Sequence, residues 1–203
     1  MKAESIAFAV AGMFFGIILG WVGAVQQGAG SASPAALAQA PAAAPAAAQQ
    51  GPAPLDEARV QALMTVAQSD PANAGARVQL ANAYFDAERF DEAVSWYEQA
   101  LAIDPTDVNA STDLGVAYYY TNRPDEALQQ FEQSLRLDPN HTKTLLNQGI
   151  VRAFGKQDLT SAAQSWQRVV EIAPTSPEGQ AAQRALDGVA AAHAGDTPTT
   201  QEP

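Results

Sequence analysis

Apolar residues recur at helical spacing between residues 74 and 176, and the same order of small and large apolar positions returns about every 34 residues. Small residues let neighbouring helices approach closely, and large residues fill the space between them. The pattern predicts pairs of amphipathic helices that stack on one another, because one pair cannot bury its apolar face alone. The small positions are Ala81, Gly115 and Gly149 in the first helix of each pair and Ala93, Ala127 and Ala162 in the second; the large ones include Leu80 and Leu114, Tyr84 and Tyr118, and Tyr97, Phe131 and Trp166.

Prolines mark the turns between the predicted units. The dipeptides Asp70-Pro71, Asp104-Pro105, Asp138-Pro139 and Ala173-Pro174 have prolines 34, 34 and 35 residues apart. Proline lacks a backbone N–H and disfavours helix in the residue before it, so each dipeptide suits the end of a helix. The units therefore run over about 74–107, 108–141 and 142–176, and the third is one residue longer.

This arrangement resembles the tetratricopeptide repeat family. The resemblance covers about residues 55–176 and implies an all-α, right-handed solenoid of about three helix pairs with capping helices. The third unit departs from the family pattern at Gln148, where leucine is usual, at Arg152, where tyrosine is usual, and by one extra residue in the turn at 155–158. The residues that carry the resemblance are Leu80, Ala81, Tyr84, Asp91, Glu92, Ala93, Tyr97, Ala100 and Pro105 in the first unit, Leu114, Gly115, Tyr118, Asp125, Glu126, Ala127, Phe131 and Pro139 in the second, and Gly149, Ala162, Trp166 and Pro174 in the third.

A helix is predicted at each end of the array. Residues 55–69 resemble the second helix of a preceding unit, and residues 176–192 form a terminal helix in which Ser176 is the cap and Pro177 takes the first position. The repeat domain is thus predicted at 55–193, followed by a disordered tail at 194–203. The residues of the terminal helix that we expect to face the array are Ala182, Ala185, Leu186 and Val189.

An uncharged stretch of twenty residues, from Ile6 to Val25, is long enough for a helix to cross a bilayer. We predict an uncleaved transmembrane signal anchor over residues 1–25. The alternative is a cleaved signal peptide, for which 22–24 and 36–38 are the candidate cleavage sites. Lys2 precedes the span and no basic residue follows it before Arg59, so the positive-inside rule predicts a cytoplasmic N-terminus and, in a bacterial inner membrane, a periplasmic repeat domain.

Glycines within this span recur every four residues. Gly12, Gly16 and Gly20 lie on one face of the predicted helix, which makes that face a candidate for homodimer packing in the membrane. The following residues, 26–54, are rich in Ala, Pro, Gly and Gln and carry no charge, so we predict a disordered linker.

The charge balance and the scarcity of catalytic and metal-binding side chains argue against several classes of function. A formal charge of −11 argues against binding of nucleic acid or of an anionic lipid surface. The chain has no cysteine, and its two histidines, His141 and His193, are predicted at a turn and at the end of the terminal helix, exposed to solvent. We therefore expect no enzyme activity, no cofactor and no metal site. The carboxylates in first helical turns, which we interpret as caps, are Asp91, Glu92, Asp125 and Glu126.

The resemblance implies that the first helices of the repeats line a concave groove, which binds a polypeptide. Three consecutive tyrosines end at Tyr120 and cover a broad arc of their helix, so at least one ring should face outward. We expect Tyr120 and Phe85 to anchor a ligand and Asn82 to bond its backbone, while Lys143 and Asp113 set the charge preference at the rim. An alternative for Tyr119 is packing on a neighbouring helix. The predicted groove residues are Val78, Asn82, Phe85, Thr112, Asp113, Val116, Tyr119, Tyr120, Lys143, Leu146, Asn147, Ile150 and Phe154.

Chaperone-binding members of the family clamp a terminal carboxylate between asparagines and basic residues. Asn82 and Lys143 match positions of that clamp, whereas Val78, Asp113 and Asn147 do not. Asp113 would repel a carboxylate, so we expect no such clamp here.

These observations predict a single-pass, membrane-anchored scaffold whose groove binds a partner polypeptide. The alternative is a structural component that self-associates in a membrane complex without a peptide ligand. The layout of anchor, spacer and repeats also resembles membrane-anchored bacterial tetratricopeptide proteins of the cytochrome c maturation group. That resemblance implies binding of apocytochrome or heme-lyase components, which is a specialised form of the first hypothesis.

Overall fold

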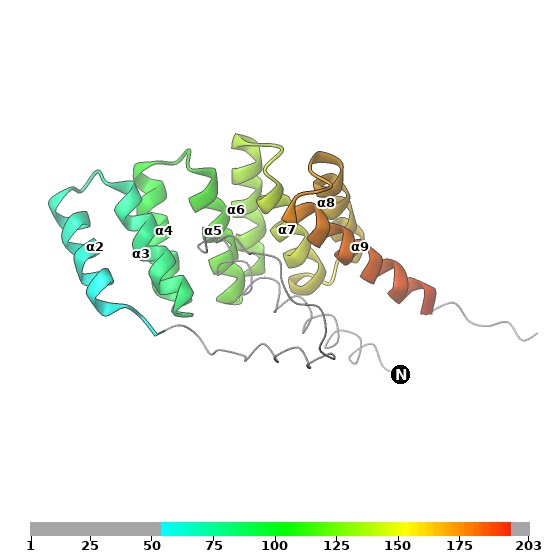
Figure 1. Ribbon diagram of the computed structural model, residues 1–203, viewed down its shortest axis with the longest axis horizontal. Helices are drawn as coiled ribbons and strands as arrows, with labels where there is room; N and C mark the ends of the chain where they lie inside the picture. The colour runs from blue at the N-terminus through cyan, green and yellow to red at the C-terminus, as the bar shows by residue number, and fades with distance from the viewer. Residues whose placement is uncertain (1–53, 196–203) are drawn as a thin grey trace, which may run out of the picture. The chain divides into compact units, whose positions relative to one another are not determined.

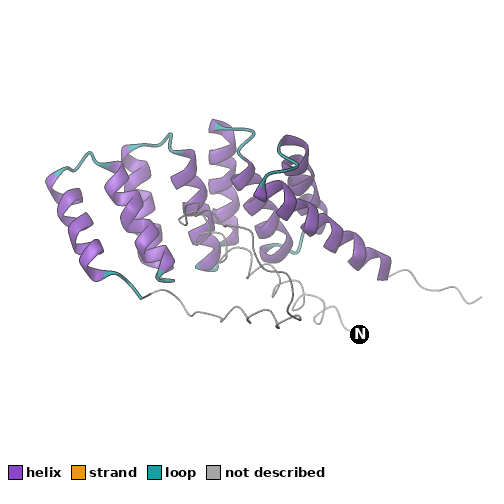
Figure 2. Ribbon diagram, viewed as in Figure 1, coloured by secondary structure: helices purple, strands orange, loops and turns teal. Residues whose placement is uncertain are grey.

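The computed structural model describes residues 54–195, with side chains to residue 192, and within that range the regular elements are helices (Figures 1 and 2). The predicted all-α stack of helix pairs is confirmed. The apolar stretch at 1–25 and the linker up to residue 53 lie outside the described residues. The elements are α2 (Glu57–Ser69), α3 (Ala74–Asp86), α4 (Phe90–Ile103), α5 (Val108–Tyr120), α6 (Pro124–Leu137), α7 (Thr142–Ile150), the π-helical turn η1 (Val151–Gly155), α8 (Leu159–Ile172) and α9 (Pro177–Gly195).

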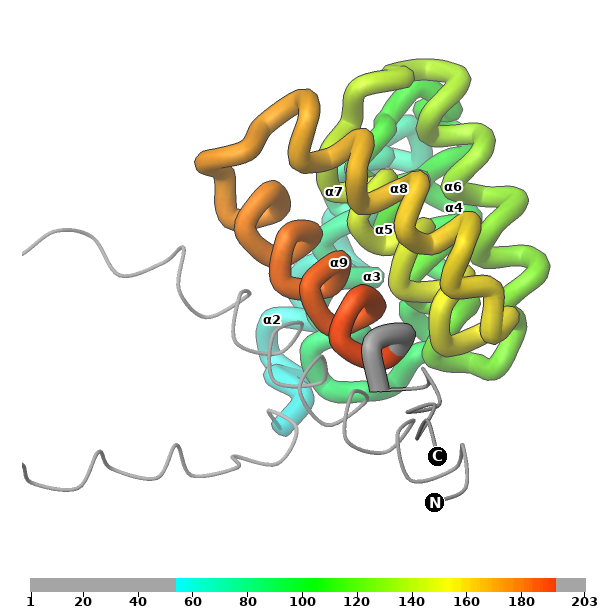
Figure 3. Tube along the Cα trace, turned by 90° about the vertical axis from the view of Figure 1, so that its right-hand side faces the viewer, coloured from blue at the N-terminus to red at the C-terminus, as the bar shows by residue number. Residues whose placement is uncertain are grey.

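The three repeats form two layers of helices. Figure 3 shows the first helices, α3, α5 and α7, in one layer and the second helices, α4, α6 and α8, in the other. The end helices cover the exposed sides of this stack, since α2 packs on α3 and α9 packs on α7 and α8. The helix α9 continues to Gly195, past the end predicted at 192, and its buried residues include Ala182 and Ala185.

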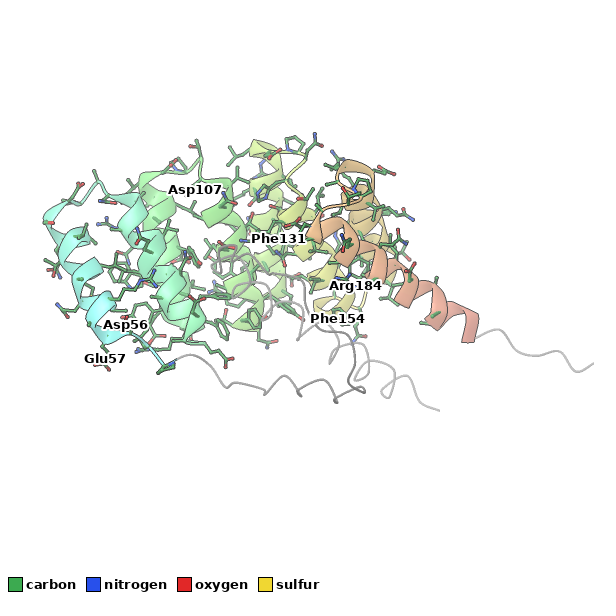
Figure 4. All side chains as sticks on the ribbon, viewed as in Figure 1. Asp56, Glu57, Asp107, Phe131, Phe154 and Arg184 are labelled. Carbon is green, nitrogen blue, oxygen red and sulfur yellow. The ribbon has the colours of Figure 1, made fainter. Side chains whose placement is uncertain are left out.

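A glycine in the first helix faces an aromatic ring of the second helix in two of the repeats. A Cβ atom added to Gly115 would lie 2.5 Å from Cε1 of Phe131, a ring that is fully buried. Figure 4 shows Phe131 in the interior, between the ribbons of α5 and α6. Gly149 lies against the indole of Trp166 in the same way, so that an added Cβ would collide with the ring. The glycines are therefore required for the close approach of each helix pair.

Side chains just before most helices bind the free backbone N–H groups of the first turn. Asp56 accepts a hydrogen bond from the N–H of Arg59 at 3.0 Å, and Asp107 does the same for Ala110 at 2.9 Å. In Figure 4, Asp56 lies at the lower edge, where α2 begins, and Asp107 at the upper edge, where α5 begins. Ser176 caps α9 as predicted, through a 3.0 Å bond from the N–H of Gly179.

The carboxylates in the first turns of α4 and α6 do not act as caps, which corrects the interpretation from sequence. Glu92 forms an ion pair with Arg89, and Glu126 forms one with Arg123. These arginines occupy the N-cap positions, where their own side chains make no capping bond. The acidic residues still lie where the helix dipole favours negative charge.

The extra residue of the third repeat lies at the end of its first helix and not in the turn after it. The final turn, η1, is π-helical, and the N–H of Lys156 bonds the carbonyl of Val151 at 3.0 Å. The turn that follows keeps the same left-handed residue in all three repeats, at Glu88, Asn122 and Gln157, with φ of 56°, 61° and 56°. A π-helical turn holds one residue more than an α-helical turn, so the insertion is absorbed before the chain reverses.

We predict that Gly115→Ala destabilises the protein by about 1–3 kcal/mol, because the added methyl group overpacks the helix pair against Phe131. Chemical denaturation of the full-length chain measures the change. The matched control is Gly188→Ala in α9, where an added Cβ meets nothing within 4 Å and the substitution should stabilise by about 0.5–1 kcal/mol. An unchanged denaturation midpoint for Gly115→Ala would remove this contact from the determinants of helix spacing.

Candidate functional site

An ion pair joins the first helices of the second and third repeats. The ammonium of Lys143 on α7 lies 2.6 Å from a carboxylate oxygen of Asp113 on α5. The two side chains are only 30% and 25% exposed, so the pair is partly shielded from water. Because Lys143 is bound to Asp113, its positive charge is largely compensated within the protein. The two residues predicted to set the charge preference are therefore partners of one another.

A buried tyrosine reaches the same layer from the second helix of the first repeat. The hydroxyl of Tyr97 on α4, a residue that is 2% exposed, donates a hydrogen bond to Oδ1 of Asn82 at 2.5 Å. Burial raises the pKa of Tyr97, so its hydroxyl keeps its proton and remains a donor. The bond uses the carboxamide oxygen of Asn82, which leaves the NH2 group as the part of the side chain suited to a ligand.

Two carboxylates act electrostatically on the Tyr97 hydroxyl. The charges of Asp113 and Asp86 both raise the pKa of Tyr97, in addition to the larger effect of burial. Desolvation raises the pKa of Asp86; Arg59 lowers it, and the nearby charge of Asp113 raises it further. Burial likewise raises the pKa of Asp113, with Lys143 acting in the opposite direction. The region is therefore acidic, and we call Asn82, Asp86, Asp113 and Lys143 the polar centre.

Aromatic rings fill the junction between the first two repeats. Phe90 stacks on Tyr120 with ring centroids 4.5 Å apart, and Phe85 meets both rings edge-on at 5.1 and 5.6 Å. Burial raises the pKa of Tyr120 to about 12. The sequence predicted that Phe85 and Tyr120 present their rings to a ligand, whereas the structure packs them on one another and on Phe90, a residue that the sequence analysis did not single out.

The junction between the second and third repeats has the same arrangement, with smaller residues in two of the three positions. One period later the corresponding positions are Tyr119, Pro124 and Gly155, and an added Cβ on Gly155 would lie 3.0 Å from Pro124 and 3.2 Å from Tyr119. Tyr119 and Val116 also pack on the cluster around Phe131. The alternative for Tyr119, packing on a neighbouring helix, is the one that the structure shows.

Other predicted groove residues are occupied by internal contacts. Ile150 and Thr112 are buried, and the hydroxyl of Thr112 lies 2.6 Å from that of Thr144. The side chain of Asn147 donates to the carbonyl of its own helix at Lys143, at 3.0 Å. Val78 packs against the apolar core formed by α2 to α5. Phe154 is half-buried and lies at the lower edge of the array in Figure 4.

His141 is not an exposed turn residue, contrary to the prediction. Its Nδ1 lies 2.7 Å from the hydroxyl of Thr144, and the residue is half-buried at the start of α7. Burial lowers the pKa of His141. The ring therefore belongs to a small polar network that holds the start of α7 against α5. His193 lies in α9, beyond the residues whose side chains are described.

The structure thus brings Asn82, Asp113 and Lys143 together with two residues that the sequence analysis did not select for this site, Asp86 and Tyr97. A signal for Asp86 was available, since it lies one period before Tyr120 and shares the same helical face. Tyr97 was assigned to the core, and its hydroxyl reaches the polar centre only because α3 and α4 pack closely.

Comparison with known proteins identifies the repeats. Two tetratricopeptide repeat family profiles match the sequence, over residues 73–140 and 112–177. No match was found among curated proteins. Among solved structures, the fold is similar to that of MamA, with 15% identity, a TM-score of 0.54, and coverage of 67% of this chain and 87% of that one.

Two further structures are of the first tetratricopeptide domain of RPAP3. The first domain of Spaghetti (RPAP3), bound to the HSP90 peptide SRMEEVD, is 26% identical over 62% of this chain and 96% of its own, with a TM-score of 0.55. The human RPAP3 domain is 23% identical over 62% of this chain and 98% of its own, with a TM-score of 0.54.

Of the helices between residues 54 and 195, none has the length and apolar character needed to cross a membrane.

We predict that Asp86→Asn raises the melting temperature at about pH 7 and has a smaller effect at about pH 4. The pKa of Asp86 is raised in the folded state, so folding favours its protonated form. The favourable contribution is present at low pH and is lost as the pH rises through the folded pKa, and asparagine removes that loss. The control is Asp91→Asn, which removes a favourable charge from the first turn of α4 and should lower the melting temperature. A lower melting temperature for Asp86→Asn at neutral pH would contradict the electrostatic assignment.

Proposed function

We propose, since this chain belongs to the tetratricopeptide repeat family, that the layer formed by α3, α5 and α7 holds an extended segment of a partner polypeptide. The observation that carries the proposal is the likeness to a tetratricopeptide domain bound to a peptide, at 26% identity and over 96% of that domain. The polar centre is the part of this layer whose chemistry suits such a ligand.

The polar centre favours a backbone or a cationic side chain over a carboxylate. The NH2 group of Asn82 is placed to donate to a peptide carbonyl, and Asp86, which has no ion pair among the described residues, suits an N–H group or a basic side chain. Lys143 is already bound to Asp113 at 2.6 Å, so it offers little attraction to an acidic ligand. The HSP90 peptide SRMEEVD of the similar structure carries three acidic side chains. We therefore infer that the partner segment of this chain differs from that peptide in charge.

We infer that the aromatic junction supports the binding layer by fixing the spacing of its helices. Phe90 and Tyr120 stack face to face and Phe85 meets both rings edge-on, so the three rings hold α3 and α5 at a constant spacing. This role replaces the anchoring role predicted for Phe85 and Tyr120 from the sequence.

The apolar stretch at 6–25 suggests how such a scaffold is located. We propose that it anchors the chain in a bacterial inner membrane with the repeats in the periplasm, on the basis of its length and of Lys2 before it. Assistance in the assembly of an envelope or cytochrome complex is a narrower form of this proposal.

A peptide library tests the binding function. We expect the full-length chain to select segments that contain Lys or Arg and that bind equally well with an amidated C-terminus. Asn82→Ala should weaken these peptides about tenfold, as for the loss of a hot-spot contact. The control is Asn109→Ala, an exposed asparagine at the start of α5, which should leave affinity unchanged.

Asp113→Asn is a second variant for the same measurement, and it should reduce the preference for basic peptides. Both Asn82→Ala and Asp113→Asn are compared with the parent chain at temperatures well below their melting points. Equal binding by the Asn82 and Asn109 variants, or a preference for acidic peptides that Asn82→Ala abolishes, would contradict this assignment of the binding layer.

Protease protection tests the proposed topology. Protease added to spheroplasts should digest the repeats and leave the anchor in the membrane, because the charge at Lys2 keeps the N-terminus in the cytoplasm. Repeats that stay intact until detergent is added would show the opposite orientation. A soluble mature chain beginning near residue 25 or 39 would show a cleaved signal.

A further inference from the structure

A cleft of about 400 Å³ opens between α6 and α8, on the side of α7 away from the polar centre. Its mouth includes three exposed residues, Pro139, Gln164 and Arg168, and its floor includes buried residues of α7 and α8. On α7 and η1 the cleft residues 145, 148 and 152 share one helical side, whereas Lys143 and Asn147 lie on the other. The lining residues are Leu135, Pro139, Leu145, Gln148, Arg152, Gln164, Ser165 and Arg168.

The cleft is lined by residues at which the third repeat differs from the second at equivalent positions. In the second repeat, the long side chain of Gln130 is buried and donates to the hydroxyl of Ser111 at 2.8 Å. Ser165 occupies the equivalent position in the third repeat, and its side chain is much shorter. Gln148 and Arg152 stand where the second repeat has leucine and tyrosine. Leu145 on α7 in turn replaces the smaller Ser111, so the long side chain lies on the first helix and the short Ser165 lies on the second, beside polar lining residues.

The polar groups of the cleft are mostly donors. Arg152 donates to the hydroxyl of Ser165 at 2.8 Å and to the carbonyl of Ser161 at 3.3 Å. The hydroxyl of Ser165 donates in turn to the carboxamide oxygen of Gln148 at 3.1 Å. This chain of bonds uses the oxygen of Gln148 and leaves its NH2 group as a donor toward the cleft.

Neither arginine of the cleft forms an ion pair with a carboxylate among the described residues, although Arg152 lies near enough to Asp158 to help lower the pKa of that carboxyl. Arg168 donates to the carbonyl of Pro139 at 3.2 Å and to the side chain of Asn140 at 3.4 Å, and both acceptors are neutral. The ion pairs of the described residues involve Arg89, Arg123, Lys143 and Lys156. In a chain of net charge −11, a cleft with two such guanidinium groups is a local positive site.

We propose that this cleft binds the side-chain carboxylate of a glutamate in a partner polypeptide. Guanidinium groups and amide N–H groups match a carboxylate in geometry and charge. The walls formed by Leu135 and Leu145 suit the methylene groups that carry the carboxylate. These apolar contacts are available to the side chain of a glutamate, whereas a small free anion makes little use of them.

The test is a titration of the nitrogen-15-labelled full-length chain, with the arginine Nε–H signals of Arg152 and Arg168 as readout. The probes are acetyl-Ser-Leu-Glu-Leu-Ser-amide, the same peptide with Gln in place of Glu, and sodium acetate. We expect the Glu peptide to bind at least about tenfold more tightly than the Gln peptide, as for the loss of one charge-assisted hydrogen bond. We expect acetate to bind more weakly than the Glu peptide.

Three variants sharpen the test. Arg168→Gln removes an exposed charge without disturbing the core, and Ser165→Gln fills the cleft with the side chain found at Gln130; each should weaken the Glu peptide about tenfold or more. Arg136→Gln, an exposed arginine on α6 outside the cleft, is the matched charge control and should leave binding unchanged.

Equal affinity for the two peptides overturns the proposal, as does equal weakening by Arg136→Gln and Arg168→Gln. Acetate binding as tight as that of the Glu peptide also overturns it, because the site then holds a free anion. Since these residues are separate from the polar centre, the result does not depend on the function proposed for α3, α5 and α7.

Discussion

The contact between a glycine in one helix and an aromatic ring in its partner determines the spacing on which the rest of the structure depends. Gly115 with Phe131 and Gly149 with Trp166 leave no room for even one carbon atom between the helices of a pair. Close packing of this kind gives each pair a defined separation, and stacking the pairs then places the first helices in one layer. The distance of 2.6 Å between Asp113 and Lys143 depends on that placement, because their helices belong to different repeats.

The 34-residue period of the sequence was sufficient to predict the fold, because it reflects constraints that act within one helix or between neighbouring helices. Proline ends a helix wherever it stands, and small and large residues alternate wherever helices pack closely. Caps were predicted for the same reason where a serine or aspartate directly precedes a helix, as at Ser176. The location of the third repeat's extra residue could not be read in this way. A loop and a π-helical turn both accommodate an insertion, and the choice depends on contacts with α6 and α8.

The candidate site was predicted less completely because side chains at equivalent positions of different repeats make different contacts. Phe85 and Tyr120 were predicted to present their rings to a ligand, but Phe90 of the next helix packs on both, with its ring centroid 5.1 Å from that of Phe85 and 4.5 Å from that of Tyr120. Conversely, Tyr97 was identified as core, and its ring is buried, yet its hydroxyl bonds Asn82 in the polar centre. Helical periodicity describes the direction of a side chain, whereas its role depends on the length of that side chain and on its partners across repeats.

The π-helical turn η1 keeps an added residue from changing the orientation of the residues that follow it. In a regular α-helix, one more residue would rotate every later side chain by about 100° around the axis. Here Phe154 still takes the place that Tyr119 has in the preceding repeat, and Lys156 reaches Asp125 of α6 at 2.7 Å. The helix α8 then begins with its own cap at Asp158, as though nothing had been inserted. One repeat of the array can thus gain a residue while the side chains that follow the insertion keep their directions around the helix axis.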